Sequence, residues 1–257
     1  MNDTAIKILN AKIGETHLFF IGQAGYIIKS KNGQLLALDL CLSECVERIE
    51  GHMGFKRLVP KILDPYELTL DCVIATHPHL DHFDVDAIPQ LMSNRHTHLF
   101  ASVDCEKVAE RLQMSGENTT YVKPGDSHDC GDFHIDFVDC DHGEGAPDAF
   151  GAVVTVDGKK IYMAGDTCLR MDRVDELKNL GPFDVVIGPI NGAFGNMNEK
   201  DFAQYAHALE GKLIIPCHFG MFAAHGGDPG KFLEIMKNEY PDDSTLLMCL
   251  GEGIILK

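Results

Sequence analysis

The residues best suited to chemistry in this chain lie in one short segment, 76–82, which reads Thr-His-Pro-His-Leu-Asp-His. Imidazole is a good ligand for Zn, Fe and Mn, and a carboxylate adds a hard oxygen ligand. In an extended chain, residues i and i+2 point the same way, so His77 and His79 can hold one ion together. A turn at the next residue would let Asp81 and His82 face a second ion beside the first.

Three further residues with ligand chemistry each follow an apolar run elsewhere in the chain: His142, Asp166 and His218. Taken alone, each has an ordinary structural explanation, because a histidine at a strand end is often a hydrogen-bonded residue and aspartate favours turns and helix N-caps. Their joint occurrence with the segment 76–82 indicates a metal centre. A carboxylate at Asp166 can bridge two ions and neutralise their charge, which neutral imidazole cannot do.

The elements that must position these residues follow from hydrophobic periodicity. Residues 17–40 read as consecutive strands around an Asn32-Gly33 hairpin turn, and Asp157-Gly158 predicts a second hairpin. Further strands are predicted at 71–76, 97–101, 133–140, 152–156, 160–164, 184–189, 212–217 and 245–250. Helices are predicted at 85–92, 106–112, 174–180, 200–209 and 230–238. This order predicts a layered α/β fold, and no linker or repeat divides it, so we expect one domain over residues 1–257.

Composition limits the classes of partner. The 257 residues include 22 Lys and Arg and 39 Asp and Glu, a net charge of −17. This excess of acid disfavours binding to nucleic acid and to anionic membranes. We find no basic leader and no apolar run of the roughly 18 residues that a membrane span needs. The nine scattered cysteines contain no C-x-x-C pair and favour a reducing compartment, so we expect a cytoplasmic protein.

Taken in order, these motifs resemble the metallo-β-lactamase superfamily. Four other segments resemble its branch typified by L-ascorbate-6-phosphate lactonase: 21–26, 56–60, 191–195 and 216–221. The resemblance implies a four-layer αββα sandwich with the site between the sheet edges.

The resemblance also implies how the ligands divide between two metals. It assigns His77, His79 and His142 to the first ion, and Asp81, His82 and His218 to the second, with Asp166 as the bridge. It implies Mn or Zn as the ion, with one or two ions bound, and a homo-oligomeric assembly.

The activity that the resemblance implies is metal-dependent hydrolysis of a carboxylic ester, the opening of a sugar lactone such as L-ascorbate 6-phosphate. The nucleophile would be metal-bound hydroxide, because a metal lowers the pKa of bound water from about 15.7 to about 7. Two alternatives stay open: a phosphodiesterase or nuclease on the same metal platform, and a metal-binding scaffold without catalysis.

Several residues are candidates for supporting roles. Asp81 can orient the nucleophile as well as bind metal, and His225, in a Gly-rich loop after His218, is either a substrate contact or acid, or a plain loop residue. Asp39 and Asp148 are candidates to fix the ligand histidines, with a turn-forming or solvated role as the alternative.

The substrate contacts are read from charge and polarity. A phosphorylated lactone would need cations or backbone N–H groups for its phosphate. Lys56, Arg57 and Arg170 are the candidates, with an ordinary surface role as the alternative for each. Asn191, in a polar Gly-rich stretch after the strand 184–189, is a further candidate for contact with a small-molecule substrate.

Overall fold

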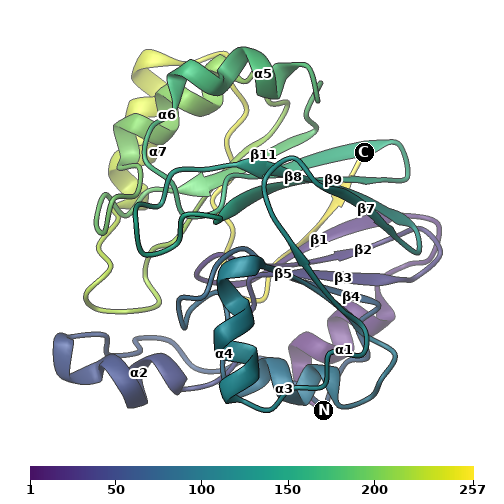
Figure 1. The fold of residues 1–257 in the computed structure, drawn as a ribbon. Coiled ribbons are helices and arrows are strands. Elements are labelled where there is room, and N and C mark those ends of the chain that lie inside the picture. The colour runs from purple at the N-terminus through teal and green to yellow at the C-terminus, as the bar shows by residue number, and fades with distance from the viewer.

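A computed structural model describes every residue from Met1 to Lys257 as two β-sheets packed face to face, with helices on both outer faces (Figure 1). One sheet has seven strands in the order β13-β1-β2-β3-β4-β5-β6, and the other has six in the order β12-β11-β10-β9-β8-β7. In both sheets, an antiparallel part continues into parallel strands: β3 to β6 in the first sheet and β10 to β12 in the second.

The strands of the seven-stranded sheet are β1 (Thr16–Gly22), β2 (Gly25–Lys29), β3 (Leu35–Leu38), β4 (Cys72–Ala75), β5 (His98–Ser102), β6 (Thr119–Val122) and β13 (Gly253–Leu256). Those of the six-stranded sheet are β7 (Ser127–Cys130), β8 (Phe133–Asp139), β9 (Phe150–Val156), β10 (Lys159–Met163), β11 (Val185–Pro189) and β12 (Ile214–Cys217). The α-helices are α1 (Asp3–Asn10), α2 (Cys45–Glu50), α3 (Ala87–Met92), α4 (Glu106–Arg111), α5 (Val174–Lys178), α6 (Glu199–Ala208) and α7 (Pro229–Glu239), and three 3-10 turns are η1 (Gly51–Met53), η2 (Val103–Cys105) and η3 (Met171–Arg173).

The hydrophobic core lies in three layers that follow this arrangement. A cluster of 26 buried residues fills the space between the two sheets. A second cluster of 22 packs α1, α3 and α4 against the outer face of the first sheet, and a third of 17 packs α5, α6 and α7 against the second. The predicted αββα sandwich is therefore confirmed. None of the helices combines the length and apolar character that crossing a bilayer requires.

Most predicted elements are confirmed. The strands and helices predicted after residue 70, apart from 245–250, agree with the structure within two residues at each end. Both hairpins are present, since β2 pairs antiparallel with β3 around Asn32-Gly33 and β9 with β10 around Asp157-Gly158. The short elements α1, α2, β6 and β7 are not among the predicted ones.

The strand predicted at 245–250 is wrong. Thr245 forms a single parallel bridge to Ile214, and the chain then leaves the second sheet and joins the first as β13. The segment is apolar because it runs along the core between the sheets, where Met248 is buried. An apolar run buried in this way gives the same local pattern as a sheet strand.

Candidate metal centre and active site

The candidate ligands meet because the parallel strands of both sheets end at one place. Asp39 follows β3, the segment 76–82 follows β4, Asp166 follows β10 and His218 follows β12. The two sheet edges are joined there by a main-chain hydrogen bond of 3.3 Å from the amide of Phe150 to the carbonyl of Thr76. Loops at the carboxyl ends of parallel strands are a common location for binding sites in α/β folds.

One group of three histidines converges as the sequence predicts. Nδ1 of His79 lies 2.9 Å from Nε2 of His77 and 3.0 Å from Nε2 of His142. The donor atoms of all three lie within 4.8 Å of one another. At this separation, three imidazole nitrogens that all direct their lone pairs inward would repel one another. A cation at their centre removes this repulsion and so suits the arrangement.

A second group combines Asp81, His82 and His218. Nε2 of His218 lies 3.2 Å from Oδ2 of Asp81 and 3.4 Å from Nε2 of His82. The predicted turn at Leu80 brings Asp81 and His82 to this side, and it is closed by a 3.0 Å hydrogen bond from the amide of His82 to the carbonyl of His79.

Asp166 lies between the two groups. Its Oδ1 is 3.3 Å from Nε2 of His82, and its Oδ2 is 3.1 Å from Nε2 of His218 and 3.9 Å from Nε2 of His142. Gly165 makes this placement feasible, because its φ of +67° suits glycine and an added Cβ would stand 2.7 Å from the carbonyl oxygen of Phe150. The carboxylate is therefore placed to bridge two ions.

The electrostatics of the site fit divalent cations. Oδ1 of Asp166 is buried and accepts no hydrogen bond. Burial lowers the pKa of His142 to about 4, so this imidazole is neutral at pH 7 and has one nitrogen lone pair to offer. Burial also acts to lower the pKa of His218, but Asp166 and Asp81 outweigh it and raise that pKa to about 9. One half of the site thus keeps neutral imidazoles, and the other attracts positive charge.

Asp39 holds one ligand histidine, as the sequence proposed. Both residues are fully buried, and Nδ1 of His82 donates to Oδ2 of Asp39 at 2.7 Å. The carboxylate also accepts from the amide and the hydroxyl of Thr76, both at 2.8 Å. This bond turns Nε2 of His82 toward Asp81 and Asp166, which is how outer partners of metal ligands usually act.

Gln23 is a site residue that the sequence reasoning missed. It is fully buried, and its amide nitrogen lies 2.9 Å from Oδ2 of Asp81 and 2.5 Å from Nδ1 of His225. Its main-chain carbonyl accepts from the main-chain amide of His218 at 2.9 Å, and both residues have left-handed φ, +55° and +62°. Strained backbone of this kind costs roughly 1–3 kcal/mol per residue and is frequent at functional sites. The available signals were an amide within an apolar strand region and its place in the segment 21–26, which resembles the lactonase branch.

Asn196 is a second missed residue. Its Nδ2 donates to Oδ2 of Asp166 at 2.8 Å and to Oδ1 of Asn191 at 3.2 Å. The predicted Asn191 is therefore connected to the site through Asn196 and Asp166. The loop after β11 provides both amides, and nothing in the local sequence distinguishes the two asparagines.

Other candidates have different partners. The carboxylate of Asp148 makes no hydrogen bond to a ligand histidine; its main chain is held by Asp104 and Ser102. Lys56 is exposed and pairs with Glu47 at 3.3 Å. The guanidinium of Arg57 donates to main-chain carbonyls, among them that of Ser43 at 2.9 Å.

Arg170 likewise has acidic partners, since it pairs with Asp172 at 2.8 Å and with Asp139 at 3.5 Å. None of the three cations proposed for a phosphate is therefore left without a partner.

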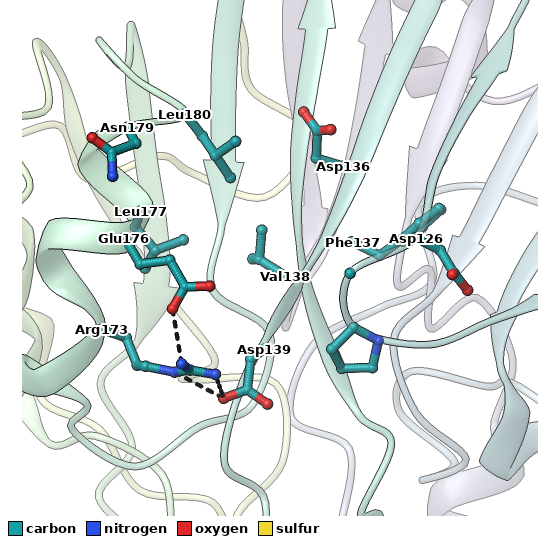
Figure 2. A pocket seen from close by; sticks show the side chains of 12 residues that line it. Asp126, Asp136, Phe137, Val138, Asp139, Arg173, Glu176, Leu177, Asn179 and Leu180 are labelled. Atoms are coloured by element: carbon teal, nitrogen blue, oxygen red, sulfur yellow. Dashed lines mark hydrogen bonds and ion pairs between the residues drawn. The ribbon is translucent and has the colours of Figure 1, made fainter.

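A separate cavity of about 630 Å³ lies between β8 and α5 (Figure 2). It is lined by acidic side chains such as Asp126 and Asp136, and Arg173 within it pairs with Asp139 and Glu176. None of the candidate ligands lines it. This cavity is distinct from the metal centre.

Comparison with known proteins is consistent with this geometry. A family model described as a beta-lactamase superfamily domain matches residues 17–218. A UPF0173 metal-dependent hydrolase from Sulfurisphaera tokodaii is 30% identical over 228 residues, covering 81% of this chain and 95% of that protein.

Two solved structures share the fold. Igni18, a metallo hydrolase from Ignicoccus hospitalis, superposes with a TM-score of 0.72 at 20% identity, covering 94% of this chain and 98% of that one. An isothiocyanate hydrolase from Delia radicum gut bacteria superposes with a TM-score of 0.69 at 22% identity, covering 93% of this chain and 98% of that one.

Proposed function

This chain belongs to the metallo-β-lactamase superfamily and is a metal-dependent hydrolase, and we propose that its small-molecule substrate is a lactone. The observation that carries the proposal is the convergence of two ligand groups on Asp166, with His225 beside them. The resemblance to the lactonase branch supports the choice of a cyclic ester.

The ligand assignment follows the two groups. His77, His79 and His142 would hold one ion, and Asp81, His82 and His218 a second, with Asp166 between them. Nitrogen and oxygen donors in this mixture suit Zn and Mn, and we propose one of these as the native ion. When bound, the metal lowers the pKa of a coordinated water and polarises the oxygen of a substrate carbonyl.

The protein's own residues would orient the reactants and donate a hydrogen bond to the leaving oxygen. Water adds to the carbonyl carbon, the ring C–O bond breaks and the ring oxygen gains a proton, so lactone and water give one hydroxy acid. Because Gln23 donates to Nδ1 of His225, neutral His225 carries its proton on Nε2, which lies 3.9 Å from Oδ2 of Asp81. We assign this Nε2–H as a hydrogen-bond donor to the leaving oxygen, whose proton comes from the attacking water, and Asp81 as the group that orients that water.

Charge favours a lactone over a phosphodiester. The chain carries a net charge of −17, and Lys56, Arg57 and Arg170 are all engaged with other partners. A nucleic acid or other polyanion normally requires free Lys and Arg side chains along its path. A compact ester needs only the metal, its bound water and one hydrogen-bond donor.

The test compares two lactones, γ-butyrolactone and L-ascorbate 6-phosphate, with the diester bis(4-nitrophenyl) phosphate, using protein loaded with Mn or Zn. We expect the lactone rings to be opened, which is monitored by the release of protons, and the diester to be cleaved much more slowly. His77→Ala should abolish turnover and lower the bound metal measured by elemental analysis. His96→Ala, which changes an exposed histidine outside the cluster, is the matched control. Diester cleavage faster than the opening of every lactone would reject the proposal.

A further inference from the structure

We propose that three phenylalanines around His225 bind an apolar substituent of the substrate, and that the site thereby selects alkyl or aryl esters over phosphorylated ones. The residues are Phe55, Phe194 and Phe222, here named the aromatic rim. This inference rests on the proposed function, because it assigns the substrate class of the same site.

The aromatic rim surrounds the imidazole ring of His225 on several sides. The ring centroid of His225 lies 5.1 Å from that of Phe55, 5.5 Å from that of Phe222 and 5.8 Å from that of Phe194. Phe55 and Phe194 also contact each other, at 5.6 Å. The rings come from three separate segments, after η1, after β11 and after β12, so the rim exists only in the folded protein.

The packing of the protein does not account for Phe194. Its side chain is 59% exposed, whereas Phe222 is buried and Phe55 is half-buried. Its φ of +55° is left-handed, a conformation that bulky residues rarely adopt. An exposed ring held in a strained conformation beside a reactive centre indicates a binding role. The exposed part of the rim is the surface on which an apolar group would lose its contact with water.

The charges at the rim disfavour a phosphate pocket there. Lys56, the neighbour of Phe55 in the sequence, pairs with Glu47 at 3.3 Å. Arg57 donates to the carbonyls of Val59 and Ser43 and lies over the ring of Phe222 at 5.9 Å, so its half-buried guanidinium already has partners within the protein. A phosphate would lose its hydration beside these rings without gaining a charged partner.

The first test measures kcat/KM for γ-lactones with side chains of increasing length, from γ-butyrolactone to γ-nonalactone, and for L-ascorbate 6-phosphate. We expect kcat/KM to rise by up to about fourfold for each methylene that the rim covers. Phe194→Ala should reduce the ratio between the longest and shortest lactones. Tyr66→Ala, which removes an aromatic ring that is 70% exposed in another part of the chain, should leave the ratio as it is.

The second test measures binding without turnover. The chain contains no tryptophan, so Phe194→Trp introduces a single fluorescent reporter into the rim. Titration with n-alkanoates from butanoate to octanoate should shift its emission, with affinity increasing along the series. Tyr66→Trp is the matched control and should give no such shift.

The outcomes separate the two proposals. If no lactone is opened but the affinity of the Phe194→Trp variant for alkanoates rises with their chain length, the rim proposal stands and the lactone assignment fails. If lactones are opened at rates independent of chain length and the alkanoate affinities are equal, the rim proposal is overturned while the function stands. Faster opening of L-ascorbate 6-phosphate than of every alkyl lactone would also overturn it.

Discussion

At the scale of single residues, the candidate metal ligands depend on neighbours that fix their orientation. Asp39 accepts from Nδ1 of His82, and Asn196 donates to Asp166. Each of these partners leaves the ligand atom of its neighbour facing the centre of the site. Because a ligand that is already oriented loses less entropy when an ion binds, removing such a partner weakens metal affinity.

Asp39→Asn tests this support. The variant places an amide where a carboxylate accepts from His82, so we expect metal affinity to fall by about 10- to 100-fold. Calorimetric titration of the metal-free protein with zinc measures this affinity. Asp148→Asn is the matched control, since the carboxylate of Asp148 makes no hydrogen bond to a candidate ligand histidine, and it should retain the original affinity. Equal affinities for the two variants would contradict the role of Asp39.

Gln23→Leu tests the amide that joins Asp81 and His225. The variant removes the donor to both side chains, and the resulting misplacement should lower kcat by about 10- to 100-fold. Steady-state kinetics together with the metal content distinguish this effect from loss of the ion. Gln90→Leu, which removes an amide bonded only to the main chain of Asp86, is the comparison. A loss of metal with kcat per bound ion unchanged would show that Gln23 acts on the ligands alone.

At the scale of elements, the arm that contains α2 and η1 is attached to the loop after β12. The amide of Leu58 donates to the carbonyl of Met221, and the amide of Ala223 donates to that of Lys56, at 2.8 and 2.9 Å. Figure 1 shows α2 at the edge of the molecule, below the loop that follows β12. This short ladder places Phe55 beside His225, so the arm and His225 are positioned together.

Arg57→Ala tests this attachment. The guanidinium donates to the carbonyls of Cys41, Ser43 and Val59, and its loss leaves these groups without that donor. We expect the free energy of unfolding to fall by about 1–3 kcal/mol, measured by urea denaturation. Lys56→Ala, at the exposed neighbouring position, should change it by less than about 0.5 kcal/mol. If Arg57→Ala left stability unchanged but raised KM only for a phosphorylated lactone, Arg57 would be a phosphate ligand instead.

At the scale of the whole molecule, the proposed ions connect the two halves of the sandwich. His77, His79, Asp81 and His82 follow a strand of the seven-stranded sheet, whereas His142, Asp166 and His218 follow strands of the six-stranded sheet. Each proposed ion therefore has ligands from both sheets. An ion that binds the native state and not the unfolded chain stabilises the fold by mass action.

Removal of metal should therefore lower the melting temperature. At free metal about 100-fold above its dissociation constant, the expected stabilisation is about 2.7 kcal/mol. For a chain of this size that corresponds to about 5–10 °C. Calorimetry of the loaded protein and of protein treated with EDTA measures the difference, and native mass spectrometry counts the ions. An unchanged melting temperature, or no restoration when Mn or Zn is returned, would contradict a site that spans both sheets.

The sequence by itself determined the ligand types and most of the elements that carry them. The segment 76–82 could be identified as a metal-binding motif because metal chemistry is a property of residue types. The spacing of its candidate ligands also lies within a few residues of sequence. Most strands after residue 70 were predictable because their apolar pattern is local as well, whereas β6, β7 and β13 were not predicted. His142, Asp166 and His218 could be added because each follows such a strand.

Only the tertiary structure decided which side chains surround these ligands. Gln23 contacts Asp81, 58 positions away, and His225, 202 positions away, so no local pattern reveals it. The aromatic rim joins three segments, and the partners of Arg57 make it a structural residue rather than a free cation. Hydrogen bonds and ring contacts depend on distance in space, which a sequence pattern does not record once the partners lie on different strands. The metal chemistry is thus local in the sequence, whereas the surroundings that would select the substrate arise from the packing of the two sheets.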